Sequence, residues 1–281
     1  MRILLTGRDG QVGWELQKTL APLGELTALG PAELDLAHSE LIRDFVREAK
    51  PEIVVNAAAY TAVDNAESER DAAFAVNATA PGILAEEANR NDALLVHYST
   101  DYVFDGTKPA PYVEKDEPNP LNVYGASKLA GERAIAASGC RHLILRTSWV
   151  YGPRGSNFYL TMLRLARERP ELRVVDDQVG APTSSLAIAR ATAQLLRQDA
   201  LGLYHMCAAG ETTWCGFARA ILAHAGIATP VVGIRTEDYP TPAKRPRNSR
   251  LDCSRLSAAF GVALAPWEEQ LALCLAGPLE K

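Results

Sequence analysis

The segment that most constrains the fold of this chain is a set of spaced glycines close to the N-terminus. Gly7, Gly10 and Gly13 follow the apolar run at residues 3–5 with the spacing G-x-x-G-x-x-G, and a helical pattern occupies residues 11–20. Glycines at such a strand-to-helix turn let backbone amides approach a pyrophosphate, whose charge the helix N-terminus stabilises. Glycines also form ordinary turns, so the strand-to-helix context is what favours a dinucleotide site here.

Strand-like and helix-like segments alternate through the first half of the chain. The apolar runs are nearly continuous, which is typical of strands covered on both faces, and the segments between them carry apolar residues at helical spacing. This alternation predicts an α/β fold, a Rossmann-type doubly wound parallel sheet with ligands beyond the carboxyl ends of its strands. The predicted strands are 3–5, 26–29, 53–55, 94–98 and 142–145, and the predicted helices are 11–20, 41–49, 71–89 and 124–137.

The pattern loosens after about residue 150, and the second half predicts a smaller lobe that closes over the ligand edge of the sheet. Its predicted elements are helices at 157–169, 185–198, 214–225 and 267–275 and a strand at 203–207, with prolines arguing against regular structure over 240–246. We therefore predict an NAD(P)-binding domain over residues 1–150. Residues 151–281 would form mainly the smaller lobe, with some segments able to return to the first domain.

Composition excludes several classes of protein. Hydrophobic residues make up 47% and charged residues 22%, as in folded soluble proteins, and the net charge of -5 gives no general reason to bind nucleic acid or an anionic membrane. The five cysteines form no C-x-x-C pair, which predicts reduced thiols, no zinc site and a cytoplasmic location. The first apolar run is too short for a signal peptide or a membrane span.

A second motif points to proton transfer. Tyr124 and Lys128 form Y-x-x-x-K at the start of a helical pattern, so the phenol and the ammonium share one helix face. A neighbouring ammonium favours the phenolate and so eases proton donation to a developing alkoxide. Thr100, at the end of the predicted strand 94–98, can offer a hydroxyl to a carbonyl or, alternatively, cap the following turn. Together with the glycine segment, these three residues predict a reductase site.

The chain resembles the extended short-chain dehydrogenase/reductases and, among them, the dTDP-4-dehydrorhamnose reductase family, over essentially its whole length. The resemblance implies NADPH- or NADH-dependent reduction of the C4 ketone of dTDP-4-dehydro-β-L-rhamnose, the last step of dTDP-L-rhamnose synthesis for cell-surface polysaccharides. The alternatives are another nucleotide-sugar reductase or epimerase, or a non-catalytic cofactor-binding regulatory subunit. The motifs that carry the resemblance are GRDGQVGWEL (7–16), VNAAAYTAVDNAE (55–67), HYSTDYVFDG (97–106), NVYGASKLAGE (122–132), RTSWVYG (146–152), DQVGAPT (177–183) and PTPAKRPRNSRLD (240–252).

The resemblance also implies roles for single residues. Tyr124 would donate the proton, and Lys128 would bridge it and the nicotinamide ribose. The cofactor contacts would be Gly10, Gln11 and Val12 at the pyrophosphate, Asp35 and Leu36 at the adenine, and Ala59, Tyr60, Thr61 and Tyr98 along the path to the nicotinamide. The substrate contacts would be Thr100, Asp101 and Tyr102 at the sugar and Trp149 at the nucleotide.

The end of the second predicted strand bears on the choice of cofactor. The dinucleotide fingerprint usually places an acid there, about 20 residues after the loop, to bind the ribose hydroxyls of NAD. This chain has Gly30 instead, which removes repulsion against a 2′-phosphate, and Arg8 can supply a cation. We therefore predict that NADPH is preferred and NADH possible. The alternative is that Glu33 or Asp35 binds the ribose.

A magnesium site is doubtful. Some members of the family dimerise through magnesium held by glutamates, and Glu15 matches one of these, but Leu186 occupies the position of another. Magnesium requires several hard oxygen ligands, so one carboxylate does not form a site. We predict no metal, with Glu15 as its one candidate ligand, and a monomer or homodimer.

Four cations, Lys244, Arg245, Arg247 and Arg250, crowd into a proline-rich segment. Arginine forks match a diphosphate well, so Arg245 and its neighbours are candidates to clamp the nucleotide sugar. The alternative is a solvated basic turn neutralised by nearby acids. Four cations in one turn do not form the extended basic surface that nucleic acid requires.

Overall fold

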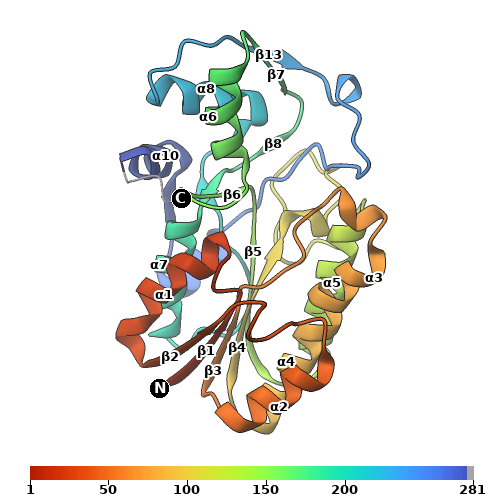
Figure 1. Ribbon diagram of the computed structural model, residues 1–281, viewed down its shortest axis with the longest axis vertical. Helices are drawn as coiled ribbons and strands as arrows, with labels where there is room; N and C mark the ends of the chain where they lie inside the picture. The colour runs from red at the N-terminus through yellow and green to blue at the C-terminus, as the bar shows by residue number, and fades with distance from the viewer. Residues whose placement is uncertain (277–281) are drawn as a thin grey trace.

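A six-stranded parallel sheet forms the centre of the computed structural model, in which residues 1–276 are described (Figure 1). The strands are β1 (Arg2–Thr6), β2 (Glu25–Leu29), β3 (Ile53–Asn56), β4 (Leu94–Thr100), β5 (Arg141–Thr147), β6 (Val150–Tyr151), β7 (Leu172–Val175), β8 (Val179–Gly180), β9 (Thr183–Ser184), β10 (Gly202–His205), β11 (Ala208–Ala209), β12 (Thr212–Thr213), β13 (Val231–Ile234) and β14 (Leu264–Pro266). The α-helices are α1 (Gln11–Leu20), α2 (Ser39–Ala49), α3 (Arg70–Phe74), α4 (Ala80–Arg90), α5 (Val123–Ala137), α6 (Phe158–Glu168), α7 (Ser185–Leu196), α8 (Trp214–His224), α9 (Ser254–Phe260) and α10 (Trp267–Ala276).

The order of the strands confirms the predicted doubly wound fold. The sheet runs β2-β1-β3-β4-β5-β10, and every neighbouring pair is parallel. The chain moves outward from β1 to β2 and then crosses to the other side of β1 to form β3. Ligands of such sheets bind at this switch point, beyond the carboxyl ends of the strands. The glycine segment, which follows β1, therefore lies at the expected crevice.

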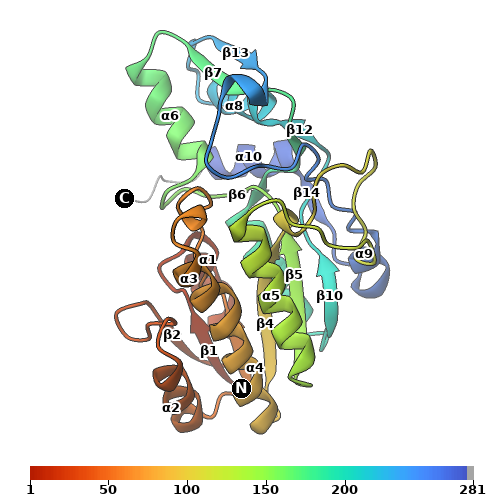
Figure 2. The same cartoon turned by 90° about the vertical axis from the view of Figure 1, so that its right-hand side faces the viewer.

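Helices cover both faces of the sheet, which explains the nearly continuous apolar runs of its strands. Helices α1 and α7 pack together on one face, and α2, α4 and α5 cover the other (Figures 1 and 2). Along β1, Ile3 and Leu5 enter the core beneath α1 and α7, whereas Leu4 enters the core beneath α2 and α4. Alternate side chains are thus buried on opposite faces.

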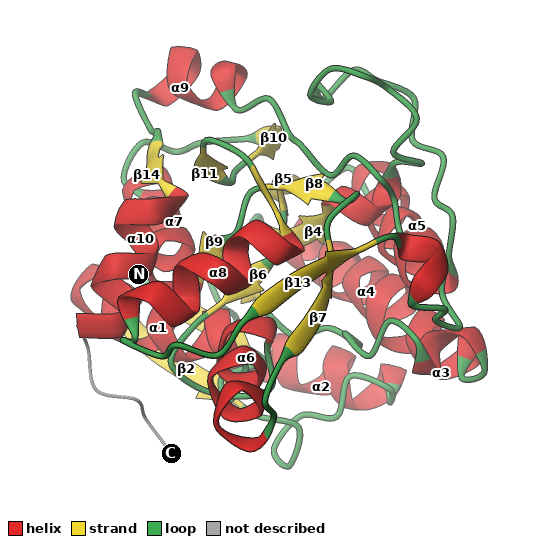
Figure 3. Cartoon of the chain, turned by 90° about the horizontal axis from the view of Figure 1, so that it is seen from above, coloured by secondary structure: helices red, strands yellow, loops and turns green. Residues whose placement is uncertain are grey.

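The smaller lobe lies above the carboxyl ends of the strands, at the top of Figure 1. It contains α6, α8 and the parallel pair β7 and β13, packed around a separate core that includes Tyr159, Phe217 and Leu172. Figure 3 shows α8 and this strand pair lying across the sheet when the molecule is viewed from above. Two segments of the second half belong to the sheet layers instead, since β10 pairs with β5 and α7 packs on α1.

One predicted helix is interrupted. The segment predicted as a single helix over 71–89 consists of α3, a π-helical turn at Ala75–Thr79 and α4, which has Pro81 in its first turn. Such π-turns are frequent at functional sites. Residues 240–246 contain no helix or strand, as their prolines predict. Within the described residues, no helix combines the length and the apolarity that crossing a bilayer demands.

Candidate active site

The glycine loop is packed so closely that side chains are excluded from it. Gly7 has φ of +74°, and a Cβ there would lie 2.5 Å from the backbone nitrogen of Ala58, just after β3. A Cβ on Gly13 would lie 1.9 Å from the carbonyl oxygen of Gly7. Helix α1 has Gly10 as its N-cap and no side-chain cap, so its first N–H groups have no side-chain acceptor there. This arrangement fits a pyrophosphate against the N-terminus of α1.

Gln11 connects the glycine loop to the smaller lobe. Its Oε1 accepts a hydrogen bond of 2.8 Å from Nδ2 of Asn157. Asn157 is also the N-cap of α6, since its Oδ1 accepts a hydrogen bond of 3.0 Å from the backbone N–H of Leu160. The side chain of Asn157 therefore both contacts Gln11, which is predicted to hold the cofactor, and caps a helix of the smaller lobe.

Near the end of β2, Arg8 and Glu33, two residues considered for contact with the cofactor ribose, form an ion pair. Arg8 Nη2 donates to Glu33 Oε1 at 2.8 Å, and Glu33 Oε2 accepts the backbone N–H of Gly30 at 3.0 Å. The Arg8 guanidinium holds the pKa of Glu33 below its ordinary value. Asp9 also borders Gly30, because a Cβ on that glycine would lie 2.2 Å from Asp9 Oδ2. The carboxylates of Glu33 and Asp9 thus lie beside Gly30, the position at which the dinucleotide fingerprint usually has an acid.

The two residues predicted to border the adenine follow in the same loop. Asp35 is exposed, and its Oδ1 accepts the backbone N–H of Ala37 at 2.9 Å. Leu36 is buried in the core beneath α2. Their contact with adenine stays a prediction.

Tyr124 is the second residue of α5, which begins one residue before the predicted start of the helix. Asn122 caps the helix by accepting the backbone N–H of Gly125 at 2.8 Å. The ring of Tyr102 meets that of Tyr124 edge to face, with 5.8 Å between centroids. Burial raises the pKa of Tyr124 to about 12, although a hydrogen bond with the Thr100 side chain opposes the rise. The phenol is therefore protonated at neutral pH.

Of the two roles predicted for Thr100, the structure shows the cap of the following turn, and contact with a carbonyl stays a prediction. Its Oγ1 accepts the backbone N–H of Tyr102 at 3.1 Å, which caps the turn after β4. The same hydroxyl donates to Asp101 Oδ1 at 3.1 Å. Burial raises the pKa of Asp101 to about 7. Its other oxygen, Oδ2, is buried without a hydrogen-bond partner in the described part of the chain. A buried acceptor of this kind is available to a substrate hydroxyl.

Lys128 belongs to a buried hydrogen-bond chain that the sequence did not reveal. Its Nζ lies 3.1 Å from Nε2 of His97, whose Nδ1 lies 3.2 Å from Nδ2 of Asn56. Asn56 Oδ1 accepts hydrogen bonds from Thr6 and from the backbone N–H of Ala58, which fixes the orientation of the amide. The Nδ2 group of Asn56 then donates to His97, and the neutral imidazole carries its proton on Nε2, facing the amine.

The burial of these groups agrees with that assignment. Desolvation lowers the pKa of His97 well below its ordinary value, and it lowers the pKa of Lys128 to about 8. Desolvation, which the charge of Glu132 opposes, makes Lys128 hold its proton less firmly than an exposed lysine does, although the amine stays mainly charged at neutral pH. The side chains of His97, Asn56 and Thr6 thus form a buried chain that ends at the amine of Lys128.

Asn77 fixes the loop after β3, where three cofactor contacts were predicted. It lies in the π-helical turn, and its side chain accepts the backbone N–H of Tyr60 at 2.8 Å and donates to the carbonyl of Tyr60 at 3.0 Å. The same amide donates to Ser127 of α5. Ala59 is half-buried and Thr61 exposed on either side of Tyr60. No role was predicted for Asn77, which joins this loop to the helix that carries Tyr124.

Three predicted contacts are engaged with other parts of the protein. Trp149, with φ of +48°, stacks on Trp214 at 3.6 Å between ring centroids. The Tyr98 hydroxyl lies 2.8 Å from Thr192 of α7, within the core. Arg245 makes two hydrogen bonds to the carboxylate of Asp64, at 2.7 and 3.0 Å. The roles predicted for these three residues with ligands stay predictions.

The basic segment is largely neutralised. Besides Arg245 with Asp64, Arg247 pairs with Glu237 at 2.6 Å and Arg250 pairs with Glu211 at 2.9 Å. A diphosphate would have to compete with these carboxylates. The pairing favours the alternative interpretation of a neutralised basic turn for Arg247 and Arg250.

Glu15 is buried on α1, with its Oε2 3.9 Å from Nζ of Lys18. Glu15 and Leu186 line one cavity of about 470 Å³, to which α10 also contributes. Between residues 1 and 276, no three metal-binding side chains cluster together. The magnesium question stays a prediction, and so does the oligomeric state.

Comparison with known proteins places these features in a family. Residues 1–278 match the family described as the RmlD substrate binding domain. The chain is similar to dTDP-4-dehydrorhamnose reductase of Burkholderia thailandensis, with 50% identity and 98% of each chain covered. It is also similar to the crystal structure of a dTDP-4-dehydrorhamnose reductase from Clostridium acetobutylicum, with a TM-score of 0.96, 39% identity and coverage of 98% and 99%. The reductase of Bacillus anthracis, solved in complex with NADP, gives a TM-score of 0.95 at 36% identity, with 98% of each chain covered.

Proposed function

This chain belongs to the dTDP-4-dehydrorhamnose reductase family, and from that premise we propose that it reduces the C4 ketone of dTDP-4-dehydro-β-L-rhamnose to dTDP-β-L-rhamnose. The observation that carries the proposal is the protonated phenol of Tyr124, which packs against Tyr102 close to the buried side chains of Thr100 and Asp101. These groups lie at the carboxyl ends of the strands, where the fold places its ligands. The relatives named above carry the same activity in their descriptions.

A nicotinamide dinucleotide fits the loop between β1 and α1. The absence of space for a Cβ at Gly7 and the lack of a side-chain cap on α1 suit a bound pyrophosphate. Gly10, Gln11 and Val12 would hold it, and the loop at Tyr60, fixed by Asn77, would border the nicotinamide. When bound, the reduced nicotinamide would supply the hydride for C4.

The side chains of this protein would supply the proton and the orientation. Tyr124 would give its proton to the C4 oxygen as negative charge develops there. A phenolate is costly in this buried setting, so a charged Lys128, one helical turn away, would stabilise it. Thr100 would orient the phenol or the carbonyl, and Asp101 would accept a hydrogen bond from a sugar hydroxyl.

The assay is consumption of reduced nicotinamide, followed by its near-ultraviolet absorbance, with dTDP-4-dehydrorhamnose and each cofactor in turn. We expect net oxidation of the cofactor and formation of dTDP-rhamnose. An epimerase would instead change the sugar without net oxidation, and a regulatory subunit would turn over no keto sugar. Either result contradicts the proposal.

We expect NADPH to be preferred, with Arg8 exchanging Glu33 for the 2′-phosphate. Glu33→Gln should free Arg8 and raise the ratio of kcat/KM for NADPH to that for NADH by about fivefold to tenfold, whereas Arg8→Ala should lower it. The measurement is the pair of steady-state constants for each variant. Glu48→Gln, an exposed site on α2, is the matched control. An unchanged ratio in Glu33→Gln would remove this ion pair from cofactor selection.

The shifted pKa of Asp101 predicts a trade between stability and activity. The folded-state pKa of about 7 lies above the ordinary value near 3.8, so the folded protein binds more protons between these values. The free energy of unfolding must then fall as pH rises from about 4 to about 7. Asp101→Asn should abolish this decline, gain about 1 to 3 kcal/mol at neutral pH, and lower kcat/KM for the sugar about tenfold.

Urea unfolding at pH values on either side of this window measures the effect. Asp105→Asn is the control of opposite sign, because the backbone N–H of Thr107 holds the pKa of Asp105 well below its usual range. It should therefore lose stability at neutral pH. A loss of stability in Asp101→Asn at neutral pH would show that the carboxylate is a structural group.

A further inference from the structure

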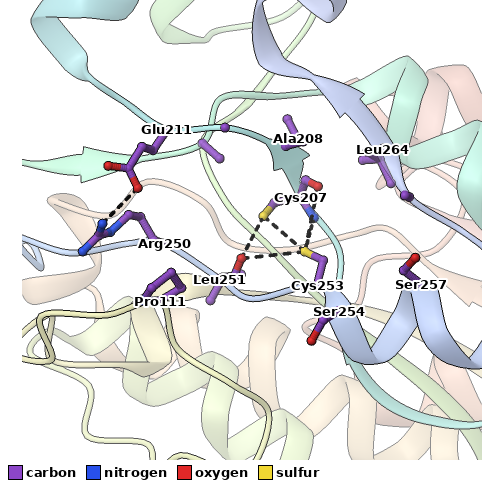
Figure 4. A pocket seen from close by; sticks show the side chains of 14 residues that line it. Pro111, Cys207, Ala208, Glu211, Arg250, Leu251, Cys253, Ser254, Ser257 and Leu264 are labelled. Carbon is purple, nitrogen blue, oxygen red and sulfur yellow. Dashed lines mark hydrogen bonds and ion pairs between the residues drawn. The ribbon is translucent and has the colours of Figure 1, made fainter.

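Two cysteines far apart in the sequence meet beside the segment that carries Arg245. Cys207 follows β10, and Cys253 is the residue before α9; their sulfur atoms lie 3.4 Å apart (Figure 4). We call Cys207 and Cys253 the thiol pair. At this separation the sulfurs are in contact and not bonded, and both cysteines are free thiols. A disulfide would bring these sulfurs from contact to bonding distance, about 2.05 Å.

The two thiols have different surroundings. The sulfur of Cys253 accepts a hydrogen bond of 3.3 Å from the backbone N–H of Cys207. The two sulfurs also contact each other, with either thiol able to donate, and the sulfur of Cys207 lies 3.7 Å from the carbonyl oxygen of Leu251. These bonds between the two cysteines hold the pKa of Cys253 below its ordinary value and raise the pKa of Cys207. Cys253 therefore carries more thiolate character and is the better nucleophile.

The thiol pair also borders a cavity. Both sulfurs belong to residues that line a cavity of about 400 Å³, together with Ala208, Ser254 and Ser257. Cys207 is buried, whereas Cys253 is partly exposed, as is Cys274. Among the remaining cysteines, burial raises the pKa of Cys140 and of Cys215, and it raises the pKa of Cys274 to about 11. Small oxidants thus meet one thiol with a lowered pKa.

We propose that the thiol pair is a site of oxidative modification, in which Cys253 reacts with hydrogen peroxide and Cys207 resolves the product to a disulfide. The Cys253 thiolate attacks one peroxide oxygen, the O–O bond breaks, and Cys253 becomes a sulfenic acid while the other oxygen leaves as hydroxide and is protonated to water. Cys207 then attacks the Cys253 sulfur, its proton leaving with the displaced oxygen as a second water. Two thiols lose two electrons, and the peroxide gains them.

Oxidation is the chemistry that this geometry favours. Zinc needs four ligands, whereas no third His, Cys, Asp or Glu joins the two sulfurs in a metal-binding group within the described chain. A disulfide would fasten the residue before α9 to the chain just beyond β10. The fastened segment continues from Ser249 and Arg245, beside the candidate active site.

The experiment treats the full-length protein with hydrogen peroxide, counts thiols after denaturation, and maps peptides by mass spectrometry. We expect the count to fall from five thiols to three, with the peptides of Cys207 and Cys253 joined and lighter by two hydrogens. Dithiothreitol should restore all of the thiols. In Cys207→Ser, dimedone should trap a sulfenic acid on Cys253, and Cys253→Ser should leave Cys207 unmodified. Cys140→Ser, the matched control, should lose two thiols as the parent chain does.

Three results would overturn the proposal, and none depends on the variants folding. Each is a result for the unmodified chain: every thiol survives peroxide, the disulfide joins other cysteines, or dimedone traps the first sulfenic acid on Cys207. Circular dichroism of the reduced variants checks that each is folded before oxidation. Because the readout is the mass of peptides, this test is independent of the proposed sugar reduction.

Discussion

Replacing Tyr124 with phenylalanine is expected to lower turnover of the keto sugar by about 10² to 10⁴-fold, the usual contribution of a positioned proton donor. The ring is retained, so its edge-to-face contact with Tyr102 survives and the start of α5 keeps its Asn122 cap. Cofactor affinity should therefore change little. The measurements are single-turnover reduction of the sugar and titration of the cofactor by fluorescence.

Tyr204→Phe is the matched control for this loss. Tyr204 lies on β10, where its ring contacts Phe260, and it has no part in the proposed chemistry. It should retain the activity of the parent chain. If Tyr124→Phe also retained full turnover, the proton would have to come from another group, and Asp101, with its pKa of about 7, would be the next candidate.

Removing the carboxylate of Glu132 is expected to cost about 3 to 5 kcal/mol of unfolding free energy. Glu132 on α5 and Arg146 on β5 form two hydrogen bonds, at 2.9 and 2.6 Å, and their side chains are only 5% and 3% exposed. Glu132→Ala leaves the guanidinium buried without its counter-charge, facing the ring of Phe104. Urea unfolding measures the loss.

Glu168→Ala provides the comparison. Its partner Arg164 lies one turn earlier on α6, and the two side chains are 52% and 60% exposed, so this variant should lose only about 0.3 to 0.5 kcal/mol. Replacing both Glu132 and Arg146 with apolar residues of similar volume should recover much of the stability, because no charge then remains buried. Equal losses in Glu132→Ala and Glu168→Ala would contradict the assigned role of burial.

The sequence could predict those parts of the fold that depend on local periodicity. Helix α1 has the predicted bounds, and the predicted strands of the sheet all exist. Continuous apolar runs indicate strands buried on both faces, and apolar residues at helical spacing indicate helices buried on one face. Strands β7 and β13 were not predicted. Each has four residues, several of them partly exposed, and they are held by pairing across a long stretch of chain.

The candidate site divides in the same way. Tyr124, Thr100 and the glycines stand in spaced motifs, so their chemistry can be inferred from the sequence. His97, Asn56 and Asn77 each stand alone within an apolar or helical segment. The only indication of their role in the sequence is that a polar side chain in a buried segment must have hydrogen-bond partners. The pairing of Arg8 with Glu33 had no such signal, because it depends on how the loop after β2 returns to β1.

The sixth strand of the sheet has a consequence for synthesis on the ribosome. Residues 1–150 contain β1 to β5, but β10 is made only after the chain has passed through α6 and β7 of the lobe. Until then the edge of β5 stays open, and α1 lacks its neighbour α7. The nascent chain thus cannot complete its first folding unit before starting its second, and the two must mature together.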